Sequence, residues 1–340
     1  MKKLMIIMAA VFLCCLSFSC NSHKQDDTQT VIDTNNLESL TKAIEANPKD
    51  PELYYYRAKF YYEHQNIKEA ESDILQAVKL NEKKPKYYVT ASDIYFAQRE
   101  TDLAEENLQK ALSIDNKFNE ARLKLAELYY IQKQYERCMT IIEEATQQNR
   151  HNPTAYLIKS FCYKETGDTA NYLRMLYLVK DQNPNEVKAH LELGYFYQQK
   201  NDAVAIDHYK NALAVDPKNQ EVNYNLGLCY LNFGDVEHAK AQFHNLLTFA
   251  NKGLYVINGL YNLGYIAMTY ENDYAGAIDF FSKAVELEPN FVDAFAARGE
   301  AYENLEKYDL ARADYEHCLK LSDNFEKAIQ GLNALDRKAR

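Results

Sequence analysis

The chain has 340 residues but no tryptophan, only 10 glycines and only 7 prolines. So few turn-forming residues exclude a collagen-like or Pro/Gly-rich disordered chain and disfavour a protein built from many short strands. Hydrophobic residues make up 47% of the sequence and charged residues 26%, which disfavours extended disorder. Basic residues are outnumbered by acidic ones, giving a formal charge of −10. This balance argues against a nucleic-acid partner, because phosphate contacts need clustered Lys and Arg.

The sequence also lacks the signatures of catalysis and of metal binding. The eight histidines are scattered, and His238 and His244 stand six residues apart, which does not place them on one helical face. No HExxH or paired-cysteine pattern is present, and no Gly-rich phosphate loop, nucleophile elbow or kinase signature occurs. The sequence therefore predicts a protein that is not an enzyme, with no catalytic residues, no metal site and no cofactor.

The first twenty residues have the pattern of a secretion signal. Two lysines precede an apolar run at residues 4–16, which is too short to span a bilayer. The small residues Ser17 and Ser19 suit ordinary signal cleavage, so plain secretion remains an alternative. Residues 16–20 resemble a bacterial lipobox, with Leu16 one place earlier than usual. The resemblance implies that Cys20 is lipidated, becomes the mature N-terminus and anchors the protein through several acyl chains.

This reading divides the chain into a lipoprotein signal peptide at residues 1–19, a lipidated cysteine with a flexible tether at residues 20–34, and a folded part at residues 35–340. The resemblance also implies an address in the cell envelope. Asn21 is not the acidic residue that retains some lipoproteins at the inner membrane, so the outer membrane is favoured. Both the periplasmic side and the cell-surface side of that membrane fit this sequence.

A period of 34 residues organises the folded part. Tyr61, Tyr95, Tyr129, Tyr163 and Tyr197 are each 34 residues apart, and Tyr230 and Tyr302 continue the series. A small residue stands three places before each repeated position: Ala58, Ser92, Ala126, Ser160, Gly194, Gly227, Gly264 and Gly299. A second helical segment carries small residues at Ala70, Ala104, Cys138, Ala205, Ala239, Ala277 and Ala311, with large apolar residues four places later. Spacings of three and four are those of helix faces, so eight helix–turn–helix units are predicted.

These units resemble tetratricopeptide repeats. The strongest match is Leu193-Gly194-x-x-Tyr197, followed by Ala205, Tyr209 and Pro217. The resemblance implies an all-α fold: a right-handed superhelical α-solenoid of about eight repeats, flanked by an N-terminal half-repeat and a C-terminal capping helix. The repeats are expected at about residues 51–84, 85–118, 119–152, 153–186, 187–219, 220–256, 257–291 and 292–325, with the cap at 326–340. About three extra residues around 251–258 should lengthen a helix or a loop there.

The ends of the array also follow a pattern. Residues 35–46 are expected to form a lone second helix. The last segment places Ile329, Leu332 and Leu335 on one face, as a capping helix requires.

The first helix of each repeat carries a second row of large side chains, called the stripe here, beside the row that packs on the second helix. Packing within the repeat does not require this row. It occupies positions five, nine and twelve, which is i, i+4, i+7 spacing. The candidate binding residues on it are Tyr55, Tyr62, Leu157, Phe161, Leu191, Tyr195, Tyr224, Leu228, Leu231, Tyr261, Tyr265 and Met268. One interpretation is that they pack against neighbouring first helices. The other is an aromatic groove that binds a partner peptide or helix, since aromatic residues and Met are enriched at recognition surfaces.

The function predicted on this basis is a protein-interaction scaffold or adaptor in the cell envelope, anchored by lipid at Cys20 and bound to a protein or peptide partner. The alternative is a glycan- or small-molecule-binding lipoprotein that uses tyrosines as stacking platforms. Four cysteines of the folded part, Cys138, Cys162, Cys229 and Cys318, are interpreted as small buried residues. A disulfide between Cys138 and Cys162 remains an alternative, because the predicted compartment is oxidising.

Overall fold

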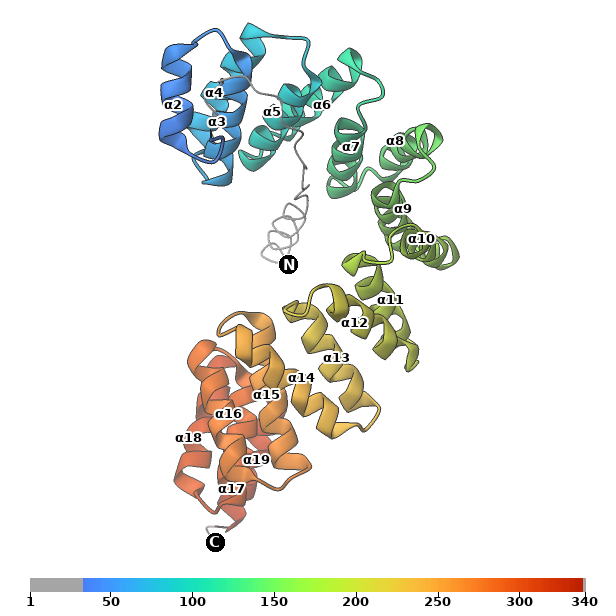
Figure 1. Cartoon of the computed structure of the whole chain (residues 1–340). Helices are drawn as coiled ribbons and strands as arrows, with labels where there is room; N and C mark the ends of the chain where they lie inside the picture. The colour runs from blue at the N-terminus through green and yellow to red at the C-terminus, as the bar shows by residue number, and fades with distance from the viewer. Residues whose placement is uncertain (1–32, 339–340) are drawn as a thin grey trace. The chain divides into compact units, whose positions relative to one another are not determined.

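The computed structural model describes residues 33–338, which form eighteen α-helices and contain no strand in that range (Figure 1). The described residues divide into two compact units, 33–83 and 84–338. The described helices of the first unit are α2 (Leu37–Ala46), α3 (Pro51–Glu63) and α4 (Ile67–Leu80). The predicted signal peptide, Cys20 and most of the tether lie outside the described residues.

The second unit alternates a first and a second helix, here called helix A and helix B of each repeat. The A helices are α5 (Pro85–Ala97), α7 (Asn119–Ile131), α9 (Pro153–Glu165), α11 (Val187–Gln199), α13 (Gln220–Asn232), α15 (Leu254–Thr269) and α17 (Val292–Asn304). The B helices are α6 (Thr101–Ile114), α8 (Tyr135–Gln148), α10 (Thr169–Gln182), α12 (Val204–Val215), α14 (Val236–Phe249), α16 (Tyr274–Leu287) and α18 (Tyr308–Leu321). With α3 and α4 as repeat one, eight repeats result. The predicted all-α solenoid is confirmed.

Both ends carry the helices that the sequence predicts. Helix α2 is a lone half-repeat that packs on α3, and its cap is Asn36, whose side chain accepts from the Ser39 N–H. At the other end, α19 (Glu326–Lys338) packs on α17 and α18. The expected face of α19 is wrong at Ile329, which is 39% exposed. The expected Leu335 is buried and Leu332 packs against the same core, and Ala328 and Gly331 complete the inward face.

The predicted insertion lengthens a helix. Helix α15 has 16 residues, whereas α13 has 13. Its cap is Gly253, which has a φ of 101°. That angle lies in a region that only glycine enters readily, so the extra residues are accommodated by one additional stretch of helix and a glycine-dependent start.

In seven of the eight repeats helix A ends in the same kind of backbone turn, whereas after α15 the turn is one residue wider and the Asp273 N–H donates to the Ala267 carbonyl. In repeat one the Tyr61 carbonyl accepts from the Asn66 N–H at 2.8 Å, and the Tyr62 carbonyl accepts from Gln65 at 3.0 Å. This is a Schellman motif, with one residue in the left-handed region. The left-handed residues are Gln65, Arg99, Lys133, Gly167, Asn201, Gly234, Asn272 and Glu306. The repeated tyrosine therefore supplies a carbonyl to the turn, whatever residue occupies the turn itself.

In four of the repeats a glycine of helix A lies against an aromatic ring of helix B. A methyl group on any of these glycines would come within 2.8 Å of a ring atom or closer, which is nearer than carbon atoms approach without a shift. The pairs are Gly194–Tyr209, Gly227–Phe243, Gly264–Phe281 and Gly299–Tyr315. These contacts give the physical reason for the small residue three places before the repeated tyrosine.

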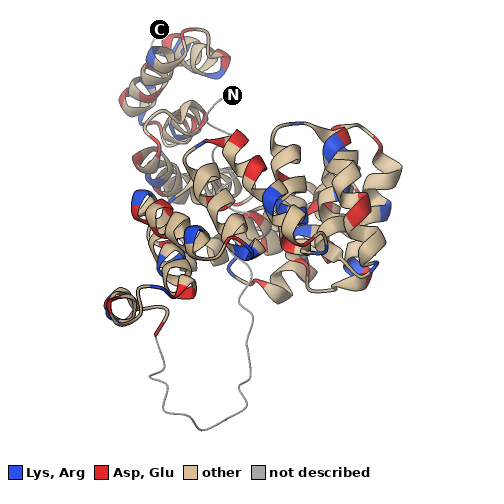
Figure 2. Ribbon diagram, turned by 90° about the horizontal axis from the view of Figure 1, so that it is seen from above, with Lys and Arg blue, Asp and Glu red and all other residues tan. Residues whose placement is uncertain are grey.

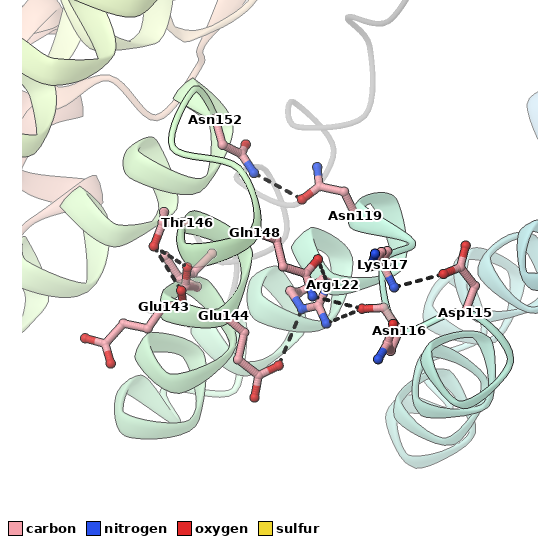
Figure 3. A network of polar contacts seen from close by, with 11 residues as sticks. Asp115, Asn116, Lys117, Asn119, Arg122, Glu143, Glu144, Thr146, Gln148 and Asn152 are labelled. Atoms are coloured by element: carbon pink, nitrogen blue, oxygen red, sulfur yellow. Dashed lines mark hydrogen bonds and ion pairs between the residues drawn. The ribbon is translucent and has the colours of Figure 1, made fainter.

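The fourth position of helix A makes one recurring hydrogen bond despite changing residue type. The side chain reaches the backbone carbonyl six residues earlier, just before the helix. The bonds are Tyr54 to Pro48, Arg122 to Asn116, His190 to Pro184 and Asn223 to Pro217. Arg122 is almost fully buried and also donates to Gln148 Oε1 at 2.9 Å, so it ties the start of α7 to the end of α8 (Figure 3).

The first and last repeats contain the same ion pair. The Arg57 guanidinium on α3 donates to both carboxylate oxygens of Asp73 on α4, at 2.6 and 2.9 Å. Arg298 on α17 does the same to Asp314 on α18, at 2.8 and 2.7 Å. Both aspartates are 6% exposed. Such two-pronged pairs fix the mutual orientation of the helices that they join.

Charges of both signs are interspersed along the helices (Figure 2). This mixture is what a solvated helical surface requires, and it does not resemble the continuous basic stripe of a nucleic-acid interface. None of the helices within residues 33–338 is both long and apolar enough to cross a membrane.

Candidate interaction surface

The stripe residues lie on successive A helices. Leu157 and Phe161 belong to α9 and Leu191 and Tyr195 to α11, and the richest segments are on α13 and α15. Helix α13 contacts α15 directly, and α7 contacts α9. The candidate residues on these two richest helices are Tyr224, Leu228, Leu231, Tyr261, Tyr265 and Met268.

Three of the candidate residues do not form an exposed surface. Leu157, Phe161 and Leu191 are 5%, 7% and 2% exposed. Leu157 and Phe161 belong to a core that also contains Leu176 of α10 and Leu193 of α11. In repeat four, and at Leu191, the structure therefore shows the packing interpretation, and the expectation of an accessible binding surface is wrong for these three side chains.

The stripe changes character at Tyr195. From there to Met268 every candidate side chain is half-buried, so part of each remains accessible. Each of three tyrosines rests against an aromatic ring of helix B of the same repeat. The ring centroids are 6.2 Å apart for Tyr195–Tyr209, 6.0 Å for Tyr224–Phe243 and 5.6 Å for Tyr261–Phe281. These tyrosines are held by the core on one side and exposed on the other.

A network of polar side chains fixes Tyr195. Its hydroxyl donates to Glu221 Oε1 at 2.5 Å, and Asn225 Nδ2 donates to the same hydroxyl at 3.1 Å. Asn225 also donates to the Glu221 backbone carbonyl at 2.7 Å. Glu221 hydrogen-bonds Tyr255 as well. Repeats five, six and seven are therefore joined by hydrogen bonds along the stripe.

The same arrangement continues on α15. Asn262 holds the repeat position that Asn225 holds on α13, and its Nδ2 donates to the Asn258 carbonyl at 2.8 Å. Asn262 also hydrogen-bonds Tyr224. The pattern of positions five, nine and twelve does not include these asparagines, so they were not predicted. The signal that could have found them is the recurrence of asparagine at position six in two adjacent repeats.

The environment keeps the tyrosines protonated. Burial raises the pKa of Tyr195, and the hydrogen bond to Glu221 raises it further because the phenol must stay a donor. Burial likewise raises the pKa of Tyr224 and Tyr261. Each phenol is therefore neutral at all physiological pH values and combines an apolar ring with a hydrogen-bonding group.

Charged residues lie on or beside the stripe N-terminal to Tyr195. Lys124 on α7 pairs with Asp93 on α5 at 2.7 Å, and Glu127 lies nearby. Burial raises the pKa of Glu127 to about 7. Glu192 on α11 is 4% exposed and accepts from Lys164 at 2.5 Å. The unit thus has a charged segment in repeats two to five and a tyrosine-rich segment in repeats five to seven.

The remaining candidates belong to the first unit. Tyr55 and Tyr62 lie on α3, and both are half-buried. The Lys59 ammonium is 6.0 Å from the centre of the Tyr55 ring. For metals, no cluster of three or more His, Cys, Asp or Glu side chains that could hold an ion occurs among residues 33–338.

Comparison with known proteins agrees with this architecture. Tetratricopeptide-repeat family models match residues 39–72, 95–160, 195–234, 220–251, 257–291 and 280–313. The BBSome complex member BBS4 of Bos taurus is 30% identical over 57% of this chain. The match spans only 37% of that protein. The human mitochondrial import receptor subunit TOM34 is 38% identical over 16% of this chain and 18% of its own length.

Among solved structures, PilW, titled a widely conserved type IV pilus biogenesis factor, covers 63% of this chain and 98% of its own. Its TM-score is 0.51 and its identity 17%, a likeness of fold alone. The helical units are therefore tetratricopeptide repeats, and the chain carries them over most of its described length. Such repeats define protein-interaction scaffolds, and this is the class of the protein.

Proposed function

We propose that the chain is a lipid-anchored scaffold of the bacterial cell envelope that binds a segment of a partner protein along the stripe of repeats five to seven. The observation that carries this proposal is the run of half-buried tyrosines at Tyr195, Tyr224, Tyr261 and Tyr265, of which Tyr195 and Tyr224 are held by hydrogen bonds. Aromatic side chains of this kind dominate the energetics of protein interfaces.

The rigidity of these side chains favours binding. A free tyrosine loses rotamer freedom when it enters an interface, at roughly 0.5–1.5 kcal/mol for each ordered side chain. Here the ring contacts with Tyr209, Phe243 and Phe281 already restrict the rings before any partner arrives. Much of that entropic penalty is therefore met during folding.

The chemistry of the surface favours a peptide segment with apolar side chains. Tyr224, Leu228, Leu231 and Met268 offer apolar area, and the half-buried amide of Asn262 lies on the same helix as Met268. Amides both donate and accept, as does a peptide backbone. A partner segment could therefore bury apolar side chains between the rings while its backbone approaches Asn262.

The anchoring part of the proposal rests on the sequence. Cys20 and the preceding apolar run lie outside the described residues, and the argument for lipidation is the lipobox resemblance of residues 16–20. Within residues 33–338 no helix offers an alternative means of spanning the bilayer.

Site-specific photocrosslinking in the native host tests the binding surface. A photoreactive phenylalanine analogue replaces Tyr224 in one variant and Tyr308 in the other, because Tyr308 is 39% exposed but lies on α18 away from the stripe. We expect a discrete protein adduct from position 224 and none from position 308. Equal adducts from both positions, or adducts to glycans from position 224, would contradict the proposal.

A further inference from the structure

Two buried cysteines meet between repeats three and four. Cys138 on α8 and Cys162 on α9 are 0% and 1% exposed, and their Sγ atoms are 3.2 Å apart. Both are thiols in this structure, in hydrogen-bond contact with each other. The two helices belong to successive repeats, so any bond between these sulfur atoms would cross a repeat boundary.

The repeat register explains why these two residues meet. Cys138 holds the small-residue position of helix B, and Cys162 holds the position just before the repeated tyrosine of the next helix A. At the boundary between repeats two and three the same two positions are Ala104 and Leu128. Cysteine occupies both positions only between repeats three and four, whereas the boundary between repeats five and six combines Ala205 with Cys229.

We propose that Cys138 and Cys162 form a disulfide bond that covalently joins repeats three and four. Two thiols lose two protons and two electrons, and one S–S bond forms. The electrons pass to an oxidant that is itself a disulfide, either a thiol-oxidising protein or a small-molecule disulfide. One thiolate attacks that disulfide, a mixed disulfide results, and the second cysteine displaces the reduced leaving thiol.

The two thiols share one hydrogen bond, in which Cys162 donates to Cys138 Sγ. Either sulfur can make the first attack on the oxidant, and the other then displaces the leaving thiol. Because both side chains are buried, oxidation takes place while α9 is still docking on α8 or during a local opening of this boundary.

The bond would restrict the separation of repeats three and four without touching the tyrosine stripe. It would close a loop between residues 24 positions apart, which contains most of α8 and most of α9. A linear array is held by contacts between neighbours, so it can open at any one boundary. The disulfide would remove one of these openings.

Peptide mapping of the full-length protein tests the proposal. The chain is refolded with oxidised and reduced glutathione, its free thiols are alkylated, and it is digested with trypsin without reduction. Cleavage after Arg137 and Lys159 places the two cysteines in separate peptides, residues 138–150 and 160–164. We expect these peptides as a single linked species, which separates into two on reduction. The peptides that contain Cys229 and Cys318 should be fully alkylated and serve as internal controls.

Two further outcomes are decisive. Full alkylation of both peptides after oxidative refolding overturns the proposal, as does a stable glutathione adduct on Cys162 without the cross-link. An Ala205→Cys variant recreates the pair with Cys229 at the boundary between repeats five and six. If repeat register brings the sulfur atoms together, this variant gains a second cross-link between the corresponding peptides. The test uses purified protein, so its result does not depend on the proposed envelope location.

Discussion

Arg298 and Asp314 form a buried two-pronged ion pair that repeats, residue for residue, the pair between Arg57 and Asp73 in the first repeat. In both cases the third guanidinium nitrogen reaches a hydroxyl on the preceding B-type helix, which is Thr41 in one repeat and Ser282 in the other. One guanidinium thus connects three helices. The first and last repeats therefore share the same three-helix connection.

Removal of one partner should destabilise the C-terminal repeats strongly. Arg298→Ala leaves the Asp314 carboxylate buried without its countercharge, and we expect a loss of about 3 kcal/mol in the free energy of unfolding. Denaturant unfolding followed by hydrogen exchange should place the loss in α16 to α19.

The matched control is Arg312→Ala, which breaks the exposed pair with Asp336. It should change stability by less than about 1 kcal/mol. Equal effects of the two substitutions would show that the burial of the Arg298 pair has no energetic consequence.

A methyl group at Gly227 should be destabilising even though alanine favours helices more than glycine does. Its Cβ would lie 2.6 Å from Phe243 Cε1, so the ring or helix α14 must move. We expect Gly227→Ala to lower stability by about 1–3 kcal/mol through overpacking. Adding Phe243→Leu should restore part of the loss, which a double-mutant cycle measures. A strictly additive cycle would contradict this account.

Truncation of Tyr265 should separate binding from folding. Tyr265 is half-buried, and its ring centroid lies 6.2 Å from that of Tyr270. Tyr261, in contrast, packs on both Phe281 and Phe291. We expect Tyr265→Ala to weaken partner binding about tenfold or more with a small change in melting temperature. Tyr261→Ala should lower the melting temperature clearly. Normal affinity in a folded Tyr265→Ala variant would remove this residue from the binding surface.

Stability should fall below neutral pH because of His208. Its Nδ1 lies 3.5 Å from Nδ1 of His190, whose Nε2 must donate to the Pro184 carbonyl. His190 Nδ1 is therefore an acceptor, and His208 Nδ1 donates to it. Burial, then His190 and Lys180, lower the pKa of His208 to about 4. Tyr177, Tyr197 and Asp207 also surround it.

The sign follows from the unfolded chain, in which histidine titrates near pH 6.5. Between pH about 6.5 and 4 the unfolded state binds more protons at this residue, so its contribution to stability is complete above that window and is lost as pH falls through it. His208→Asn keeps a donor without the titration, and its melting temperature should depend less on pH. Glu127 acts in the opposite direction, but it is common to both proteins and cancels in the comparison.

Membrane attachment should depend on Cys20. A Cys20→Ala variant expressed in the native host should move to the soluble fraction, because no described helix can hold the chain in a bilayer. Fractionation in high salt and in carbonate measures this. Retention of the variant in the membrane pellet would refute lipid anchoring while leaving the interaction surface untouched.

The fold could be predicted from the sequence because its repeated positions report packing directly. Gly227 and its equivalents mark the close approach of helix A to an aromatic ring. The burial of Leu157 and Phe161 could not be predicted in the same way, because stripe periodicity is identical for a groove and for a contact with a neighbouring helix. Only the three-dimensional positions of α10 and α11 distinguish the two.

The polar side chains were harder to predict, because their partners lie in other repeats. Glu221 is unremarkable as a glutamate in the first turn of a helix, yet it organises Tyr195 on one side and Tyr255 on the other. Likewise Tyr54, Arg122, His190 and Asn223 look unrelated in sequence, although each makes the same hydrogen bond at position four.

The left-handed turn after each helix A has a consequence for how such repeats diverge. Six of the eight left-handed residues are not glycine, and Gln65, Arg99, Lys133 and Glu306 are types that enter this region rarely. Because backbone hydrogen bonds fix the turn, its side chain is free to drift during evolution at a small conformational penalty. Sequence similarity among these repeats is therefore expected to persist in the helices, whereas the turns keep their backbone conformation and vary in sequence.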